Sequence, residues 1–128
     1  MQVVPHPDLA WEIWRPGVET RMLISALTGA AELCLFEQKV APGMGAPTHR
    51  HDVEEVLTII AGQAEAWVGD ERMAVVAGQS VIVPPGQPHG FRNTGTGLLH
   101  VHAMLASPSF EARFDGVAEP VRRWQAAP

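Results

Sequence analysis

Apolar and polar residues alternate along most of the chain, a period of two that is typical of β-strands with one buried face. Turn-forming sequences such as APGMGAP and PPGQP separate the alternating segments. No helical period of useful length occurs, except near VRRWQ at residues 121–125. The pattern predicts an antiparallel sandwich or small barrel. Eight segments are expected to be strands: residues 20–27, 31–40, 53–60, 63–70, 72–78, 80–84, 89–93 and 98–105.

The composition indicates one globular domain, which we place over residues 1–128. Hydrophobic residues make up 46% of the chain and charged residues 18%, enough for a single core and too apolar for a disordered chain. A net charge of −5 and a single lysine leave no basic surface for nucleic acid. The apolar runs are shorter than the roughly 18 residues that a membrane-spanning helix needs. With no secretion signal expected and one cysteine, Cys34, we expect a cytoplasmic protein whose thiol is a core side chain.

Metal-binding side chains are concentrated in one short stretch, HRHDVEE at residues 49–55. If this stretch is extended, side chains two residues apart lie on the same face of the strand. His49, His51 and Glu55 then point to one side, whereas Glu54 points to the other. A helix would not bring residues two apart together. Of the two adjacent glutamates, Glu55 is therefore the candidate ligand.

A flat strand would keep these side chains from reaching one ion. Four residues of flat strand span roughly 13 Å, whereas metal–ligand bonds are about 2.0–2.2 Å long. We therefore expect the segment between His51 and Glu55 to curve or bulge, as strands do in small barrels. A further ligand should come from a neighbouring strand, and His89, which follows the turn PPG, fits this role. Three imidazoles and one carboxylate would leave positions open on an octahedral divalent ion.

These residues resemble the two sequence motifs of the cupin family. The first motif matches residues 43–62 and the second matches residues 78–93. The resemblance implies an all-β fold, the double-stranded β-helix or jelly-roll barrel. It also implies one divalent transition-metal ion per chain, and Mn, Fe, Co, Ni, Cu and Zn all accept such a donor set. The motif positions present are Gly43, His49, His51, Glu55, Gly62, Gly78, Pro84, Gly86, His89 and Asn93, and the implied metal ligands are His49, His51, Glu55 and His89.

Apolar residues in phase with the candidate ligands are expected to line the pocket and exclude water. These residues are Leu57, Ile59 and Phe91. No cationic pair is in phase with the histidines, which disfavours phosphorylated sugars as ligands. The chain also has no tyrosine, so a reaction that uses a tyrosine as general acid or base is excluded.

A second His-x-His pair, His100 and His102, lies in LLHVHAML. If these side chains face the interior, they are candidate catalytic groups beside Glu55, as proton carriers or as partners of the ligands. If they face outward, they are surface or interface residues. The opposite face of this strand is the more apolar one. No glutamate follows the pair at the spacing of the first motif, so a second metal site is not expected.

We therefore expect a metal-dependent enzyme acting on a small oxygen-bearing organic substrate, and more narrowly a dioxygenase-type oxidoreductase. Glu55 would bind the ion and act as a base. Two alternatives remain open: a non-catalytic module that binds a small ligand or metal, and an isomerase or lyase that uses metal without oxygen. The expected partners are a small molecule and a second copy of the chain. Residues 1–17, with Trp11 and Trp14, are expected to cover a sheet edge or form a homodimer contact.

Overall fold

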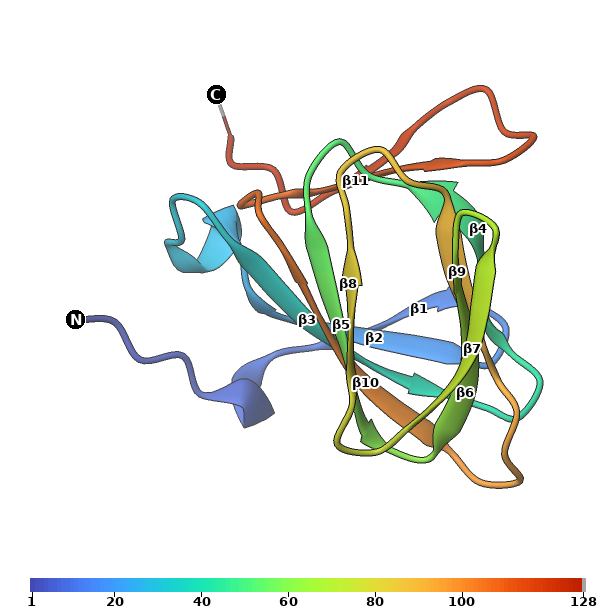
Figure 1. Ribbon diagram of the computed structural model, residues 1–128. Helices are drawn as coiled ribbons and strands as arrows, with labels where there is room; N and C mark the ends of the chain where they lie inside the picture. Colours follow the sequence, from blue (N-terminus) through green and yellow to red (C-terminus); the bar gives the residue numbers. More distant parts are fainter. Residues whose placement is uncertain (128) are drawn as a thin grey trace.

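The alternating segments form two six-stranded antiparallel sheets in the computed structural model, which describes residues 1–127. The sheets face each other and curve together into a jelly-roll barrel (Figure 1). The first sheet has the order β1 (Trp11–Arg15), β2 (Val18–Ile24), β3 (Cys34–Val40), β10 (Leu99–Leu105), β5 (Glu55–Ala61) and β8 (Ser80–Val83). The second has the order β12 (Val121–Arg123), β11 (Phe110–Phe114), β4 (Gly45–Arg50), β9 (His89–Asn93), β6 (Gln63–Val68) and β7 (Glu71–Val76).

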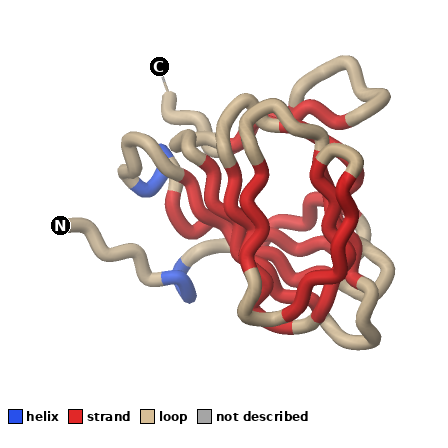
Figure 2. The backbone as a smooth tube through the Cα atoms, in the orientation of Figure 1, coloured by secondary structure: helices blue, strands red, loops and turns tan. Residues whose placement is uncertain are grey.

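Helical structure among residues 1–127 is confined to two short 3-10 turns, η1 (His6–Asp8) and η2 (Ala26–Thr28) (Figure 2). This arrangement confirms the predicted all-β jelly-roll fold. No helix in the described part of the chain has the length and apolar character that crossing a membrane requires.

The core lies between the two sheets and is filled by the apolar half of each alternation. In β10 the buried residues Leu99, Val101, Ala103 and Leu105 belong to the core cluster. Cys34 lies in the same cluster with no exposed surface, as the sequence predicts. The alternation therefore works as expected, because successive side chains of a strand face opposite sides of the sheet.

The strand prediction is wrong at the chain ends. Residues 121–125 do not form a helix, because Val121–Arg123 is strand β12, which pairs with β11. Trp124 follows with a φ of 61° and is buried. Its ring lies 5.4 Å from that of Phe36, centroid to centroid, so tertiary packing of the indole decides the local conformation. Strands β1, β11 and β12 were missed, and β4 was considered only as an extended stretch that carries the histidines.

Two glycines allow β4 and β9 to approach each other closely. A Cβ at Gly90 would lie 2.5 Å from the carbonyl oxygen of Ala46, and one at Gly45 would overlap the backbone of Phe91. Any larger residue would push these strands apart. The close approach matters because His49 and His89 are paired directly across the same two strands.

Candidate metal centre

Four buried polar side chains, His49, His51, Glu55 and His89, meet in the interior of the barrel. His49 and His89 are paired residues of β4 and β9 in the second sheet. Glu55 begins β5 in the first sheet, and His51 lies in the crossing between them. The chain thus leaves one sheet after Arg50 and enters the other at Glu55. This crossing is the bend that the sequence analysis expected between His51 and Glu55.

The outer nitrogen of each imidazole is tied to a backbone carbonyl. Nδ1 of His49 lies 2.7 Å from the oxygen of Pro47, and Nδ1 of His51 lies 2.7 Å from that of Glu111. Nδ1 of His89 lies 2.8 Å from the oxygen of Gln87. A carbonyl oxygen only accepts, so each Nδ1 must donate its proton. A neutral ring then has an unshared electron pair on Nε2, which is the form that binds a metal.

The inner nitrogens converge on the carboxylate. Nε2 of His51 lies 3.2 Å from Oε2 of Glu55, and Nε2 of His89 lies 3.3 Å from Oε1. Both Nε2 atoms are buried, and in the described part of the chain they have no hydrogen-bond partner besides these carboxylate contacts. One ring nitrogen from each of His49, His51 and His89 lies within 4.8 Å of the other two. Two ligand atoms that are each bonded to one ion at about 2.0–2.2 Å lie about 3 Å from each other. The distances from the two Nε2 atoms to the Glu55 oxygens therefore suit a divalent transition metal.

Electrostatics keep Glu55 and His49, but not His51, in forms suited to a cation. Burial raises the pKa of Glu55, but His51 and His89 outweigh it and hold the pKa below its usual range, so the carboxylate is ionised. Burial, together with the neighbouring His89 and His51, lowers the pKa of His49 to about 3, so this ring is neutral. Burial also lowers the pKa of His51, yet the Glu55 carboxylate outweighs burial and the net pKa is raised. A proton and a metal therefore compete for the space between His51 and Glu55.

The space beside these donors is small. A cavity of about 20 Å³ is bordered by His49 and Glu55, enough for about one water molecule. Leu57 and Phe91 line it, whereas Ile59 is buried in the core and is absent from its wall, which corrects that part of the sequence prediction. A larger hollow of about 570 Å³, lined by residues of β6, β7 and β8, is bordered by none of the four donors. Cavity volume alone therefore does not identify the candidate metal site.

An aromatic and cationic rim next to the donors was missed by the sequence analysis. Phe114 stacks on His49 with ring centroids 5.0 Å apart, and Trp14 and Arg15 line the small cavity. The same three residues also line a neighbouring pocket of about 290 Å³, which Arg123 borders. Burial and the charge of Arg123 lower the pKa of Arg15. A cationic pair therefore does lie near the histidines, contrary to expectation.

Two donors on this rim lack protein partners. Trp14 Nε1 and Arg123 Nε are buried and make no hydrogen bond in the described part of the chain. Arg15 Nη1 donates to the carbonyl of Gly45 at 2.9 Å, which fixes the position of this guanidinium. Unsatisfied buried donors are costly in isolation. Trp14 and Arg123 both also border the pocket of about 290 Å³.

His100 and His102 lie outside this centre. They alternate with the core residues of β10 and face the outer side of the first sheet. Their contacts are with Glu37, on the neighbouring strand β3. Their placement argues against direct catalytic roles beside Glu55, since the sheet itself separates the two groups.

The chain is similar in sequence to known proteins. Auxin-binding protein 1 of Arabidopsis thaliana is 27% identical over 104 residues, which cover 73% of this chain and 52% of that protein. The HTH-type transcriptional regulator PuuR of Escherichia coli is 26% identical over 100 residues, 78% of this chain and 54% of the regulator. The chain therefore spans about half the length of these curated relatives.

A solved structure with a similar fold is the polyketide cyclase RemF from Streptomyces resistomycificus. It matches with a TM-score of 0.77 and 25% identity, over 93% of this chain and 88% of the cyclase. The family model described as "Cupin domain" matches residues 36–105. That range covers more than half of the chain and includes all four interior donors, so this chain belongs to the cupin family.

Proposed function

We propose that this protein is a metal-dependent enzyme acting on a small, oxygen-bearing organic substrate. The observation that carries the proposal is a buried space in which one ring nitrogen from each of three imidazoles comes together, with the Glu55 carboxylate beside two of them. Each imidazole is oriented by a backbone carbonyl, so the donor set is preorganised before any ligand arrives.

His49, His51, Glu55 and His89 would hold one divalent ion. Such an ion would supply Lewis acidity toward a substrate oxygen and, with a redox-active metal, one-electron chemistry with O₂. The small cavity beside the donors restricts what reaches them to groups about the size of a water molecule. The bulk of a substrate would therefore remain in the adjoining pocket of about 290 Å³, the size of a small-molecule site.

The rim residues define which substrates would bind. Arg15 and Arg123 bring positive charge to this pocket, which Asp115 offsets in part, and Trp14 gives it an aromatic wall. These groups favour an anionic oxygen such as a carboxylate or an enolate. Phe91 and Leu57 would exclude water from the inner space, and the ionised Glu55 would accept a proton from the bound substrate.

More narrowly, we favour a dioxygenase-type reaction on a diol or diketone. The structural likeness to a polyketide cyclase supports a second candidate, a metal-dependent reaction without oxygen, such as a cyclisation, isomerisation or lyase reaction. The likeness to an auxin-binding protein and a transcriptional regulator supports a third, a module that binds a small ligand without converting it. A homodimer and a cytoplasmic location stay predictions.

Oxygen consumption separates these candidates. Untagged protein loaded with Fe²⁺ or Mn²⁺ would be mixed with catechols and β-diketones in an oxygen electrode, with product analysis on the same samples. Oxygen uptake that His51→Ala abolishes supports the dioxygenase. Substrate conversion without oxygen uptake overturns that reaction and favours the cyclase-like candidate. Metal and ligand binding with no conversion would overturn the enzyme proposal in favour of the binding module.

A further inference from the structure

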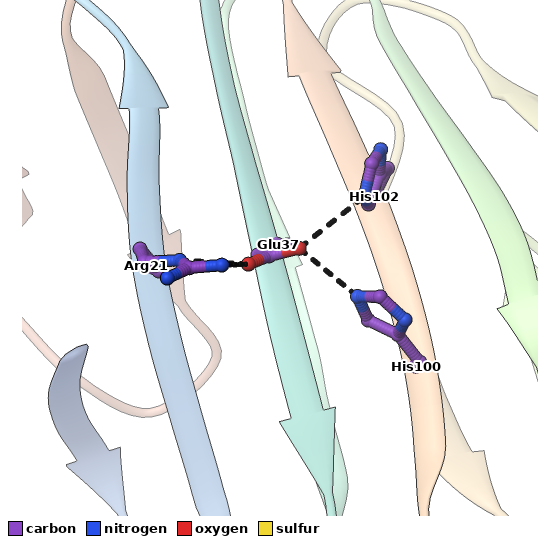
Figure 3. A network of polar contacts seen from close by, with 4 residues as sticks. All are labelled: Arg21, Glu37, His100 and His102. Carbon is purple, nitrogen blue, oxygen red and sulfur yellow. Dashed lines mark hydrogen bonds and ion pairs between the residues drawn. The ribbon is translucent and has the colours of Figure 1, made fainter. Parts of the chain in front are cut away.

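A second group of metal-ligating side chains lies on the outer face of the first sheet (Figure 3). His100 and His102 are on β10, and Glu37 is on the neighbouring strand β3. Glu37 is paired directly with His102 in the sheet register, and His100 is paired with Lys39. Neighbouring strands therefore supply the carboxylate that the sequence around His100 and His102 lacks.

The distances suit a shared cation. Oε2 of Glu37 lies 3.0 Å from Nε2 of His100 and 3.4 Å from Nε2 of His102. A tetrahedral ion with bonds of about 2.0–2.1 Å places its ligand atoms about 3.3 Å apart. The two imidazole planes meet at 76°, so the rings are not stacked on each other. We infer that Glu37, His100 and His102 form a second divalent-metal site, suited to Zn²⁺.

Arg21 positions the carboxylate for this role. Its Nε lies 2.8 Å and its Nη2 lies 2.6 Å from Oε1 of Glu37, so the guanidinium occupies one oxygen. The second oxygen, Oε2, is left to face the two histidines (Figure 3). Arg21 is itself held over the ring of Trp11, 4.6 Å from its centroid. The carboxylate is thus fixed by a rigid sheet, which reduces the ordering cost of binding an ion.

The site is open to solvent on one side. The side chains of His100 and His102 are 29% and 33% exposed, whereas Glu37 is buried. Three protein ligands leave the fourth position of a tetrahedral ion for water or for a ligand from solution. The charge of Arg21 opposes a dication here, so we expect weaker binding than in the interior.

The histidines of the chain allow a clean test. Of the six, three lie in the interior centre and two in this outer site, and His6 lies in η1, away from both. The double variant His100→Ala/His102→Ala removes the outer site, and His49→Ala/His51→Ala removes the interior one. His6→Ala is the matched control for adventitious binding by an exposed imidazole.

The measurement is titration of Zn²⁺ and Co²⁺ into untagged, chelator-treated protein, followed by calorimetry and visible absorption. We expect about two ions per wild-type chain, and about one in each double variant. The ion remaining in His49→Ala/His51→Ala should show the absorption of Co²⁺ bound by imidazole and carboxylate, and His102→Ala in that background should weaken it more than about tenfold. His6→Ala should bind as the wild type does.

The inference is overturned if His49→Ala/His51→Ala binds no ion while its circular dichroism and thermal melting remain those of a folded protein. It is also overturned if His100→Ala/His102→Ala binds as many ions as the wild type, because the contacts around Glu37 would then be an ion-pair network only. If the interior centre binds no metal, His100→Ala/His102→Ala will bind no ion, whereas His49→Ala/His51→Ala will still bind one. Failure of the proposed function is therefore distinguishable from failure of this site.

Discussion

Oε1 of Glu55 lies 3.3 Å from Nε2 of His89, although the two residues belong to opposite sheets. The interior donor set therefore links β5 of the first sheet to β9 of the second. An ion held by both residues would connect the two halves of the barrel. Because such an ion binds the folded chain and finds no assembled site in the unfolded one, its binding energy is also folding energy.

Metal should accordingly stabilise the fold. At a free Zn²⁺ concentration of about 100 times Kd, we expect the free energy of unfolding to rise by about 2.7 kcal/mol. Urea denaturation with and without the ion measures this, in the His100→Ala/His102→Ala background so that only the interior centre responds. Adding His49→Ala to that background should remove the gain. An equal gain with and without His49 would contradict the assignment.

Replacing Glu55 by glutamine should weaken metal binding while preserving shape. Glu55→Gln keeps the side-chain volume but removes the negative charge that faces His51 and His89. We expect the affinity of the interior centre to fall by about 10–100-fold, measured by competition with a chromophoric chelator. Glu54→Gln is the matched control, since Glu54 is exposed and lies outside the centre. Similar affinities for the two variants would show that Glu55 is not a ligand.

Gly90 should be essential for the spacing of β4 and β9. A Cβ there would lie 2.5 Å both from the Ala46 carbonyl oxygen and from an atom of the Trp67 ring. We expect Gly90→Ala to cost about 1–3 kcal/mol in the free energy of unfolding, because the strands must separate. Gly97→Ala is the control, since a Cβ at Gly97 meets nothing within 4 Å. Equal urea midpoints for both variants would refute this account of the strand pair.

Cys34 should be unreactive in the folded protein. Burial raises the pKa of its thiol to about 12, so almost no thiolate exists at pH 8, and the side chain has no exposed surface. We expect no modification by a thiol reagent at pH 8 within the time that denatured protein reacts fully. Rapid labelling of the native protein would mean that β3 opens far more readily than its central place in the sheet implies.

The interior centre could be predicted because its signals are local. The spacing of His49, His51 and Glu55 sets which side chains share a face, and the strand period alone selected Glu55 over Glu54. In the structure Glu55 is buried and Glu54 is exposed, as this period predicts, although His49 and Glu55 lie on strands of opposite sheets. The rim could not be predicted in the same way. Arg15 and Arg123 lie near opposite ends of the chain, and only folding brings them to one pocket.

The sequence by itself determined most of the strands, the family and the four candidate interior donors, because alternation and motif spacing act over short stretches of chain. The direction in which His100 and His102 point, and the identity of the carboxylate beside them, were decided by tertiary structure. Glu37 is paired with His102 although 65 residues separate them, since β3 and β10 are neighbours only in the folded sheet. Register between distant strands depends on the packing of the whole barrel, and no local pattern contains it.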